Sequence, residues 1–173
     1  MARRIDAAVG WLAWAMAMLG GLALMAVMLS TVASVAGRAA IPLGLGPVPG
    51  DYELVEVGTA FAVAAFLPWC QWRRGHVTVD IALGPLGPRV NAWVDVTANL
   101  LMTLGAGLLT WRMALGLRDK MGDGFYVETT FILQFPVWWG YAAALSGLVA
   151  FTLVSAWTVA RSVREATGRE ARG

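Results

Sequence analysis

The amino-acid sequence predicts an all-α integral membrane protein with four transmembrane helices, both termini on one side and a short interfacial segment between the second and third helices. Of its 173 residues, 58% are hydrophobic and only 14% are charged, against about 25% charged residues in an average soluble domain. The mean hydropathy is +0.65, and the charged residues lie at the margins of four long apolar runs. A water-soluble domain could not bury so much apolar surface, so we expect one membrane domain over residues 1–173 with spans at 9–36, 52–72, 89–117 and 135–160.

The first apolar run, Ala7 to Gly37, contains no charged residue and is preceded by Arg3 and Arg4. It is longer than the roughly 20 residues that a membrane helix needs. A cleaved signal peptide is the alternative interpretation, but its apolar region is only about 7–15 residues long. We therefore expect a retained helix.

The second span follows a loop, residues 39–50, that is too rich in glycine and proline for a helix. It starts near Tyr52 and ends near Trp72, with Pro68 expected to kink its last turns. Residues 76–86 alternate apolar and polar side chains, which is typical of a strand. An unpaired strand at a membrane surface is costly, so we expect a short surface-lying helix there.

The third span begins at Pro88, a favourable residue in the first turn of a helix. At about 1.5 Å per residue it exceeds the ~30 Å hydrocarbon layer, so it must tilt or protrude. A polar loop covers residues 118–124. We expect a short turn at 131–135, a last span with Pro136 in its first turn, and a frayed basic tail at 161–173.

The distribution of cations predicts the orientation. Four spans place nine arginines on the side of the termini, Arg3, Arg4, Arg73, Arg74, Arg89, Arg161, Arg164, Arg169 and Arg172. The other side receives four cations, Arg38, Arg112, Arg118 and Lys120. The positive-inside rule therefore predicts cytoplasmic termini. All nine tryptophans fall near predicted helix ends, as in the aromatic belts of membrane proteins.

Several function classes are disfavoured by what the sequence contains. The net charge is +2, but the cations flank apolar runs, so we expect no nucleic-acid binding. The single cysteine, Cys70, excludes an internal disulfide and a cysteine metal cluster, and the single histidine, His76, excludes bis-histidine haem ligation. We expect no catalytic residue, no metal site, no substrate site and no cofactor.

Polar residues inside membrane spans usually have a partner, because they are costly there. Glu53 and Glu56 lie in the first turns of the second span, where the helix dipole favours anions. Asp95 and Asn99 lie near one end of the third span, and Arg112 near the other, either reaching the interface or contacting another membrane protein. The predicted middle of each span has no charged residue, so we expect no solute pathway through this chain alone. Its many small residues favour close packing of helices.

Two motifs resemble the small membrane subunit of TRAP (tripartite ATP-independent periplasmic) transporters, the DctQ-like family. The first follows the second span and reads Arg73-Arg74-Gly75-His76-Val77-Thr78-Val79-Asp80. The second precedes the last span and comprises Glu128-Thr129-Thr130, Leu133, Pro136, Trp138 and Tyr141. Glu53-Leu54 is similar to the acidic start of the family's second helix. The sequence departs from the family pattern at Thr130, at Phe135 and in having a single acid at Glu53.

The resemblance implies a scaffold subunit in the bacterial inner membrane. Its partners would be a large DctM-like membrane subunit, which holds the substrate and sodium sites, and a periplasmic binding protein that delivers an organic carboxylate or sulfonate. Candidate contacts are Glu53, Arg73, Arg74, His76, Asp80, Arg112, Glu128, Pro136 and Trp138. Three alternatives stay open at this point: the small subunit of a tripartite tricarboxylate transporter, a four-helix membrane enzyme and a self-sufficient small exporter.

Overall fold

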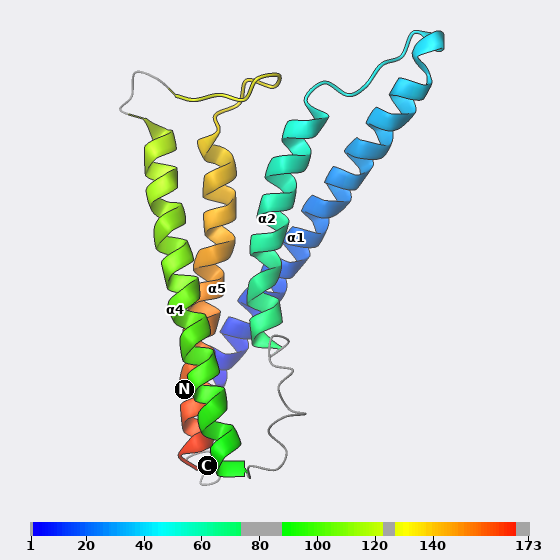
Figure 1. Cartoon of the computed structure of the whole chain (residues 1–173). Helices are drawn as coiled ribbons and strands as arrows, with labels where there is room; N and C mark the ends of the chain where they lie inside the picture. The colour runs from blue at the N-terminus through cyan, green and yellow to red at the C-terminus, as the bar shows by residue number, and fades with distance from the viewer. Residues whose placement is uncertain (1, 74–87, 123–126, 169–173) are drawn as a thin grey trace.

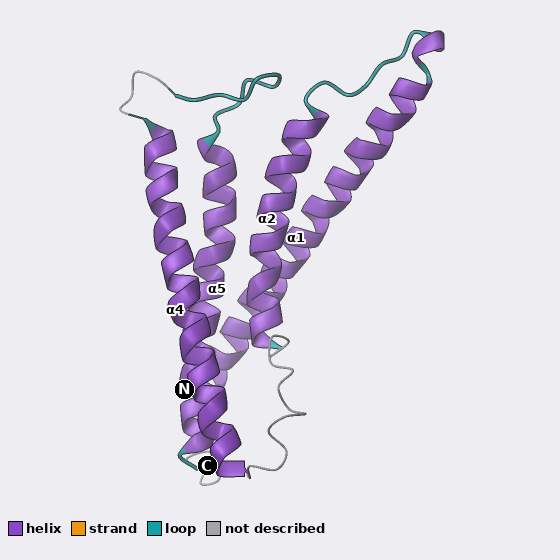
Figure 2. Ribbon diagram, in the orientation of Figure 1, coloured by secondary structure: helices purple, strands orange, loops and turns teal. Residues whose placement is uncertain are grey.

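The computed structural model describes residues 2–73, 88–122 and 127–168. These residues form four long helices, α1 (Ala2–Ala39), α2 (Asp51–Trp72), α4 (Pro88–Met121) and α5 (Trp138–Ala166), and one short 3-10 helix, η1 (Ile41–Leu43). Figure 2 shows no strand in the described part of the chain. Each long helix is long and apolar enough to cross a membrane. The predicted all-helical class with four membrane-spanning helices is thus confirmed.

The helices extend beyond the predicted spans at most of their ends. α1 starts before residue 9, α4 continues to Met121 and α5 continues to Ala166. The prediction of a frayed tail from residue 161 is therefore wrong for its first six residues, because polar residues can continue a helix beyond the apolar layer. Pro68 lies inside α2, which continues to Trp72. The predicted surface helix at 76–86 lies outside the described residues.

The start of α5 differs from the prediction in a way that matters for the site. Pro136 does not lie in the first helical turn, because α5 begins at Trp138 with Val137 as its N-cap. Pro136 instead forms an isolated antiparallel bridge with Thr129. The expected short turn at 131–135 is the tip of this reverse turn.

The four helices pack in the order α1, α2, α5, α4, with α2 and α5 in the centre. In the most apolar 18-residue stretch of α5, 44% of the residues are buried, whereas in the most apolar stretch of α4 only 6% are. Figure 1 shows the α1–α2 pair and the α4–α5 pair close together at one end and diverging towards the other. We call the end where α1 starts and α5 ends the termini end, and the opposite end, where the pairs diverge, the distal end.

Small residues let the two central helices approach closely. A Cβ atom added to Gly147 of α5 would lie 2.6 Å from the main-chain carbon of Ala64 in α2. Ala64, Ala144 and Leu148 form the core cluster where these helices meet. Because lipid gives helices no hydrophobic drive to associate, such close contact is a main source of their attraction.

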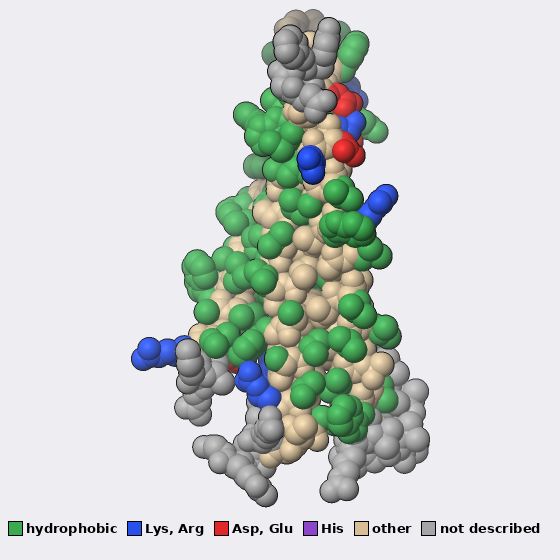
Figure 3. Space-filling model, turned by 90° about the vertical axis from the view of Figure 1, so that its left-hand side faces the viewer, with side chains coloured by type: hydrophobic (Ala, Val, Ile, Leu, Met, Phe, Trp, Pro, Cys, Tyr) green, Lys and Arg blue, Asp and Glu red, His purple; other side chains and the backbone are tan. Residues whose placement is uncertain are grey.

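The large apolar side chains mostly point outwards. Exposed residues on α1 and α4 include Leu22, Met25, Leu29, Leu101, Leu104 and Leu108. On the face shown in Figure 3, hydrophobic side chains cover the middle, while the lysines, arginines and acids gather towards the two ends. This distribution suits a molecule whose middle is in contact with hydrocarbon.

Candidate partner interface

At the distal end, the Glu53 carboxylate binds the tip of the turn that precedes α5. Its Oε1 accepts a hydrogen bond from the main-chain N–H of Ile132 at 2.7 Å, and its Oε2 accepts one from the N–H of Leu133 at 3.0 Å. From the sequence, Glu53 was explained in part by the helix dipole and was predicted as a candidate contact to a partner. The structure shows a second reason for an acid here, because two amides that point the same way form a small anion-binding concavity.

The turn itself is held by main-chain hydrogen bonds across its base. The N–H of Thr130 donates to the carbonyl of Phe135 at 3.0 Å, and the N–H of Val137 donates to that of Glu128 at 2.9 Å. Gln134 has a φ of 55°, in the left-handed region that lets the chain reverse. We call residues 128–137 the distal turn.

The distal turn is also joined to the end of α4. Lys120 Nζ lies 2.5 Å from Glu128 Oε2. Three elements therefore meet through Glu53 and Glu128: the start of α2, the end of α4 and the distal turn. Two candidate contact residues, predicted to face a partner, are thus engaged within the chain.

Aromatic rings surround the start of α5. Trp138 packs edge-on against Trp139, with ring centroids 6.2 Å apart, and Phe135 stacks on Trp139 at 6.5 Å. Trp138 is half-buried, whereas Trp139 is 55% exposed and Phe131 at the tip of the turn is 93% exposed. The surface available to a neighbour here consists of Trp139 and Phe131 as much as of the predicted Trp138.

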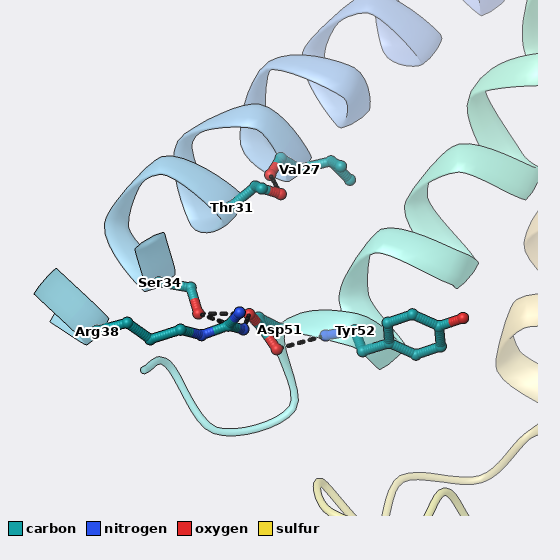
Figure 4. A network of polar contacts seen from close by, with 6 residues as sticks. All are labelled: Val27, Thr31, Ser34, Arg38, Asp51 and Tyr52. Carbon is teal, nitrogen blue, oxygen red and sulfur yellow. Dashed lines mark hydrogen bonds and ion pairs between the residues drawn. The ribbon is translucent and has the colours of Figure 1, made fainter. Parts of the chain in front are cut away.

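A second polar cluster, not predicted from the sequence, joins the ends of α1 and α2 (Figure 4). Asp51 Oδ2 accepts hydrogen bonds from Arg38, at 2.9 Å, and from the hydroxyl of Ser34. Its Oδ1 accepts one from the main-chain N–H of Tyr52 at 2.8 Å, while the Thr31 hydroxyl bonds within α1 to the carbonyl of Val27. The sequence did contain a signal for this cluster: Arg38 follows the first predicted span, and the oppositely charged Asp51 directly precedes the second.

Near the termini end, a buried amide network connects three helices. Gln71 Nε2 donates to Asn99 Oδ1 at 2.8 Å and to Thr158 Oγ1 at 2.9 Å. Asn99 Nδ2 donates in turn to Ser162 Oγ at 3.0 Å. All four side chains are at most 4% exposed. The network ties α2, α4 and α5 together, and sequence analysis identified only Asn99 among its members.

Arginines at the termini end lie over tryptophan rings. Arg73 is 5.7 Å from the ring centroid of Trp69, Arg161 is 5.5 Å from that of Trp72, and Arg164 is 4.9 Å from that of Trp157. Such cation–π contacts are typical of a helix end at a membrane interface. Three candidate contact residues, Arg74, His76 and Asp80, lie outside the described part of the chain.

Arg112 is exposed about two and a half turns before the end of α4. No hydrogen bond or ion pair joins its side chain to another described residue. Of the candidate contacts that the structure describes, Arg112 is therefore available for a charged group on a neighbouring protein.

In the middle of the described helices, hydroxyl side chains form polar contacts. The hydroxyls of Thr110 and Thr152 lie 2.8 Å apart, and both also bond to the carbonyl of Leu148. No group of three potential metal ligands occurs in residues 2–73, 88–122 and 127–168. An apolar cleft of about 210 Å³ opens between the helix pairs near the distal end, with Glu56 at its wall.

Comparison with known proteins identifies the family. The sequence model of the tripartite ATP-independent periplasmic transporters, DctQ component, matches residues 27–165. No curated protein and no solved structure matches the chain. The matched region contains α2, α4, the distal turn, nearly all of α5 and the last third of α1, so it includes both motifs on which the resemblance was based. The chain belongs to the DctQ family, the small membrane component of TRAP transporters.

Proposed function

We infer that this chain scaffolds the large membrane subunit of a TRAP transporter, which takes up an organic carboxylate or sulfonate together with sodium. The DctQ family works in general with a large membrane subunit and a binding protein. We assign the periplasmic binding protein the role of delivering the anion to the large subunit. Family membership also makes the chain a transporter component rather than an enzyme.

The observation that best supports a scaffold is the contrast between the inside and the outside of the four helices. Inside, many of the buried residues are small, and the buried amides and hydroxyls around Gln71 bond to one another. Outside, large apolar side chains cover α1 and α4. Substrate and ion sites in transporters use polar groups and broken helices near mid-depth, whereas the described spans here are continuous helices with charges towards their ends.

For the orientation, we propose cytoplasmic termini in the bacterial inner membrane. The start of α1 and the end of α5 lie at the same end of the molecule (Figure 1). With nine of the thirteen cations assigned to that end, the positive-inside rule favours the cytoplasm. The distal turn and the loop from η1 to α2 then face the periplasm.

The candidate contacts divide into two groups under this proposal. Glu53, Glu128 and Pro136 shape the distal turn, so they act on a partner through the surface that the turn presents. Arg112, Trp138 and Arg73 contact the large subunit or lipid directly. Arg74, His76 and Asp80 stay proposed contacts. The DctQ match assigns the chain to TRAP transporters rather than to the tripartite tricarboxylate transporters.

Purification in mild detergent tests the proposal. The tagged chain, expressed with its native neighbours, should recover one larger membrane protein in a fixed ratio. Arg112→Ala should lower that recovery, because it removes an arginine that has no partner within the described chain, whereas Arg118→Ala, at the water-facing end of α4, should not. Recovery of the chain alone under conditions that preserve its fold would contradict a scaffold role.

A further inference from the structure

A groove between α1 and α5 at the termini end combines an apolar body with a cationic mouth. It has a volume of about 460 Å³ and is lined by Ala8, Val9 and Leu12 of α1 and by Leu153, Ala156 and Trp157 of α5. In Figure 1 the first turns of α1 (dark blue) pass beside the last turns of α5 (orange to red). Small side chains hollow the groove at Ala8 and Ala156, and its volume falls within the roughly 300–1,000 Å³ of typical ligand pockets.

Two arginines lie at the end of this groove that points towards the membrane surface. Arg164 lies 4.9 Å from the ring centroid of Trp157, which lines the groove. Arg4 is exposed one turn before Ala8 on α1. Neither arginine forms an ion pair with another residue whose side chain the structure describes. Their charges are therefore available to an external anion.

The wall of the groove is fixed by a hydrogen bond from the Trp157 ring. Trp157 Nε1 donates to Asp6 Oδ1 at 3.0 Å, which sets the orientation of the indole and leaves its face to Arg164. Asp6 brings one negative charge close to the mouth, so Arg4, Arg164 and Asp6 together give a net charge of +1. Arg161 adds little, because it pairs with Glu165 at 3.4 Å and lies over Trp72.

We propose that this groove is a binding site for one anionic phospholipid. An acyl chain lies between α1 and α5 along Leu12 and Leu153, and the phosphate lies at Arg164 and Arg4. A zwitterionic lipid fills the same apolar groove but lacks the net negative charge that the mouth attracts. Basic pockets between membrane helices bind anionic headgroups by the same combination of burial and charge. The site does not depend on whether the chain holds a transport subunit.

Native mass spectrometry of the full chain in mild detergent tests the site. Phosphatidylglycerol and phosphatidylcholine with identical acyl chains are added at equal concentration, and the bound fractions are compared. We expect phosphatidylglycerol to be bound about five-fold more, the factor that corresponds to about 1 kcal/mol for the one net positive charge at the mouth of the groove. Arg164→Gln should reduce the ratio to about one, and Arg164→Lys should keep most of it.

Two further variants distinguish lipid bound in this groove from a free anion at its mouth and from lipid bound elsewhere on the chain. Arg118→Gln removes a cation at the distal end and should leave the ratio unchanged. Ala156→Leu fills the groove while leaving Arg164 in place, so it should lower phosphatidylglycerol binding. Binding that survives Ala156→Leu, or that millimolar inorganic phosphate displaces, would show that the mouth binds a free anion and that the groove is no lipid site. Equal binding of both lipids by the unchanged chain, or an equal loss in Arg118→Gln, would also overturn the proposal.

Discussion

Glu53 and Leu133, 80 residues apart in the chain, are joined by a 3.0 Å hydrogen bond between a side-chain carboxylate and a main-chain N–H. The bond connects the start of α2 with the distal turn before α5, across the end of the molecule where the helix pairs diverge (Figure 1). The Leu133 side chain also packs over Gly50, where an added Cβ atom would lie within 2.4 Å of it. The distal turn is thus held to α2 by polar and apolar contacts together.

We expect Glu53→Ala to loosen the distal turn, because the N–H groups of Ile132 and Leu133 lose their acceptor. The variant should unfold at a lower temperature in detergent and expose the peptide bonds of residues 130–135 to limited proteolysis. Glu56→Ala, one turn further along α2, is the matched control, since no hydrogen bond from another described residue to its carboxylate is found. Equal protease sensitivity of the two variants would show that Glu53 does not hold the turn.

The sequence predicted both sides of this contact but not the contact itself. Glu53 and the motif around Glu128 were identified because each resembles a family pattern. Their meeting depends on how α2 packs against α5, which hydropathy does not specify. The start of α5 was predicted too early for a related reason: Pro136 pairs with Thr129 in an antiparallel bridge across the turn, so the helix begins only at Trp138.

The buried amide network could not be predicted because each of its members, taken alone, looks like an ordinary residue near a helix end. Gln71 follows Cys70 in an aromatic stretch, and Thr158 and Ser162 are common in membrane helices. Only the packing of three helices brings them within 3.0 Å of one another. The four spans, in contrast, were predictable, because long uncharged apolar runs separated by polar or glycine- and proline-rich loops leave few other structures in a membrane.

Replacing Gln71 by leucine should destabilise the fold. The change leaves the buried Oδ1 of Asn99 without its donor, and an unsatisfied buried group costs about 1–3 kcal/mol. The free energy of unfolding can be measured by denaturing detergent titration, with Thr97→Val as control, because among the described residues the Thr97 hydroxyl bonds within its own helix, to the carbonyl of Trp93. Combining Gln71→Leu with Asn99→Leu should cost less than the sum of the two single changes. Strict additivity would mean that the two amides act independently.

Two glycines should respond in opposite ways to the same substitution. Gly147→Ala should destabilise the chain by about 1–3 kcal/mol, because the new methyl group overlaps Ala64 of α2. At Gly107 of α4, no described atom outside the adjoining backbone of α4 lies within 4 Å of an added Cβ atom. Gly107→Ala should therefore be neutral or stabilise the helix by up to roughly 1 kcal/mol. Thermal unfolding of both variants in the same detergent checks the expectation, and a tolerated Gly147→Ala would mean that α2 and α5 do not meet closely there.

The proposed orientation predicts which positions are accessible from outside the cell. In a Cys70→Ser background, Leu43→Cys places a thiol on η1, where the native side chain is 82% exposed at the distal end. A membrane-impermeant maleimide should label it in intact cells once the outer membrane is permeable. Thr167→Cys, just after α5 at the termini end, should react only after the inner membrane is opened. The reverse pattern would place the termini in the periplasm.

The most direct test of a scaffold that conducts no solute is uptake into liposomes under a sodium gradient. The purified chain alone should accumulate no carboxylate or sulfonate above the level of protein-free liposomes. Uptake should appear when the large membrane subunit and the loaded binding protein are added, and should be lost when this chain is left out. Sodium-driven accumulation of an organic anion by the chain alone would contradict the account.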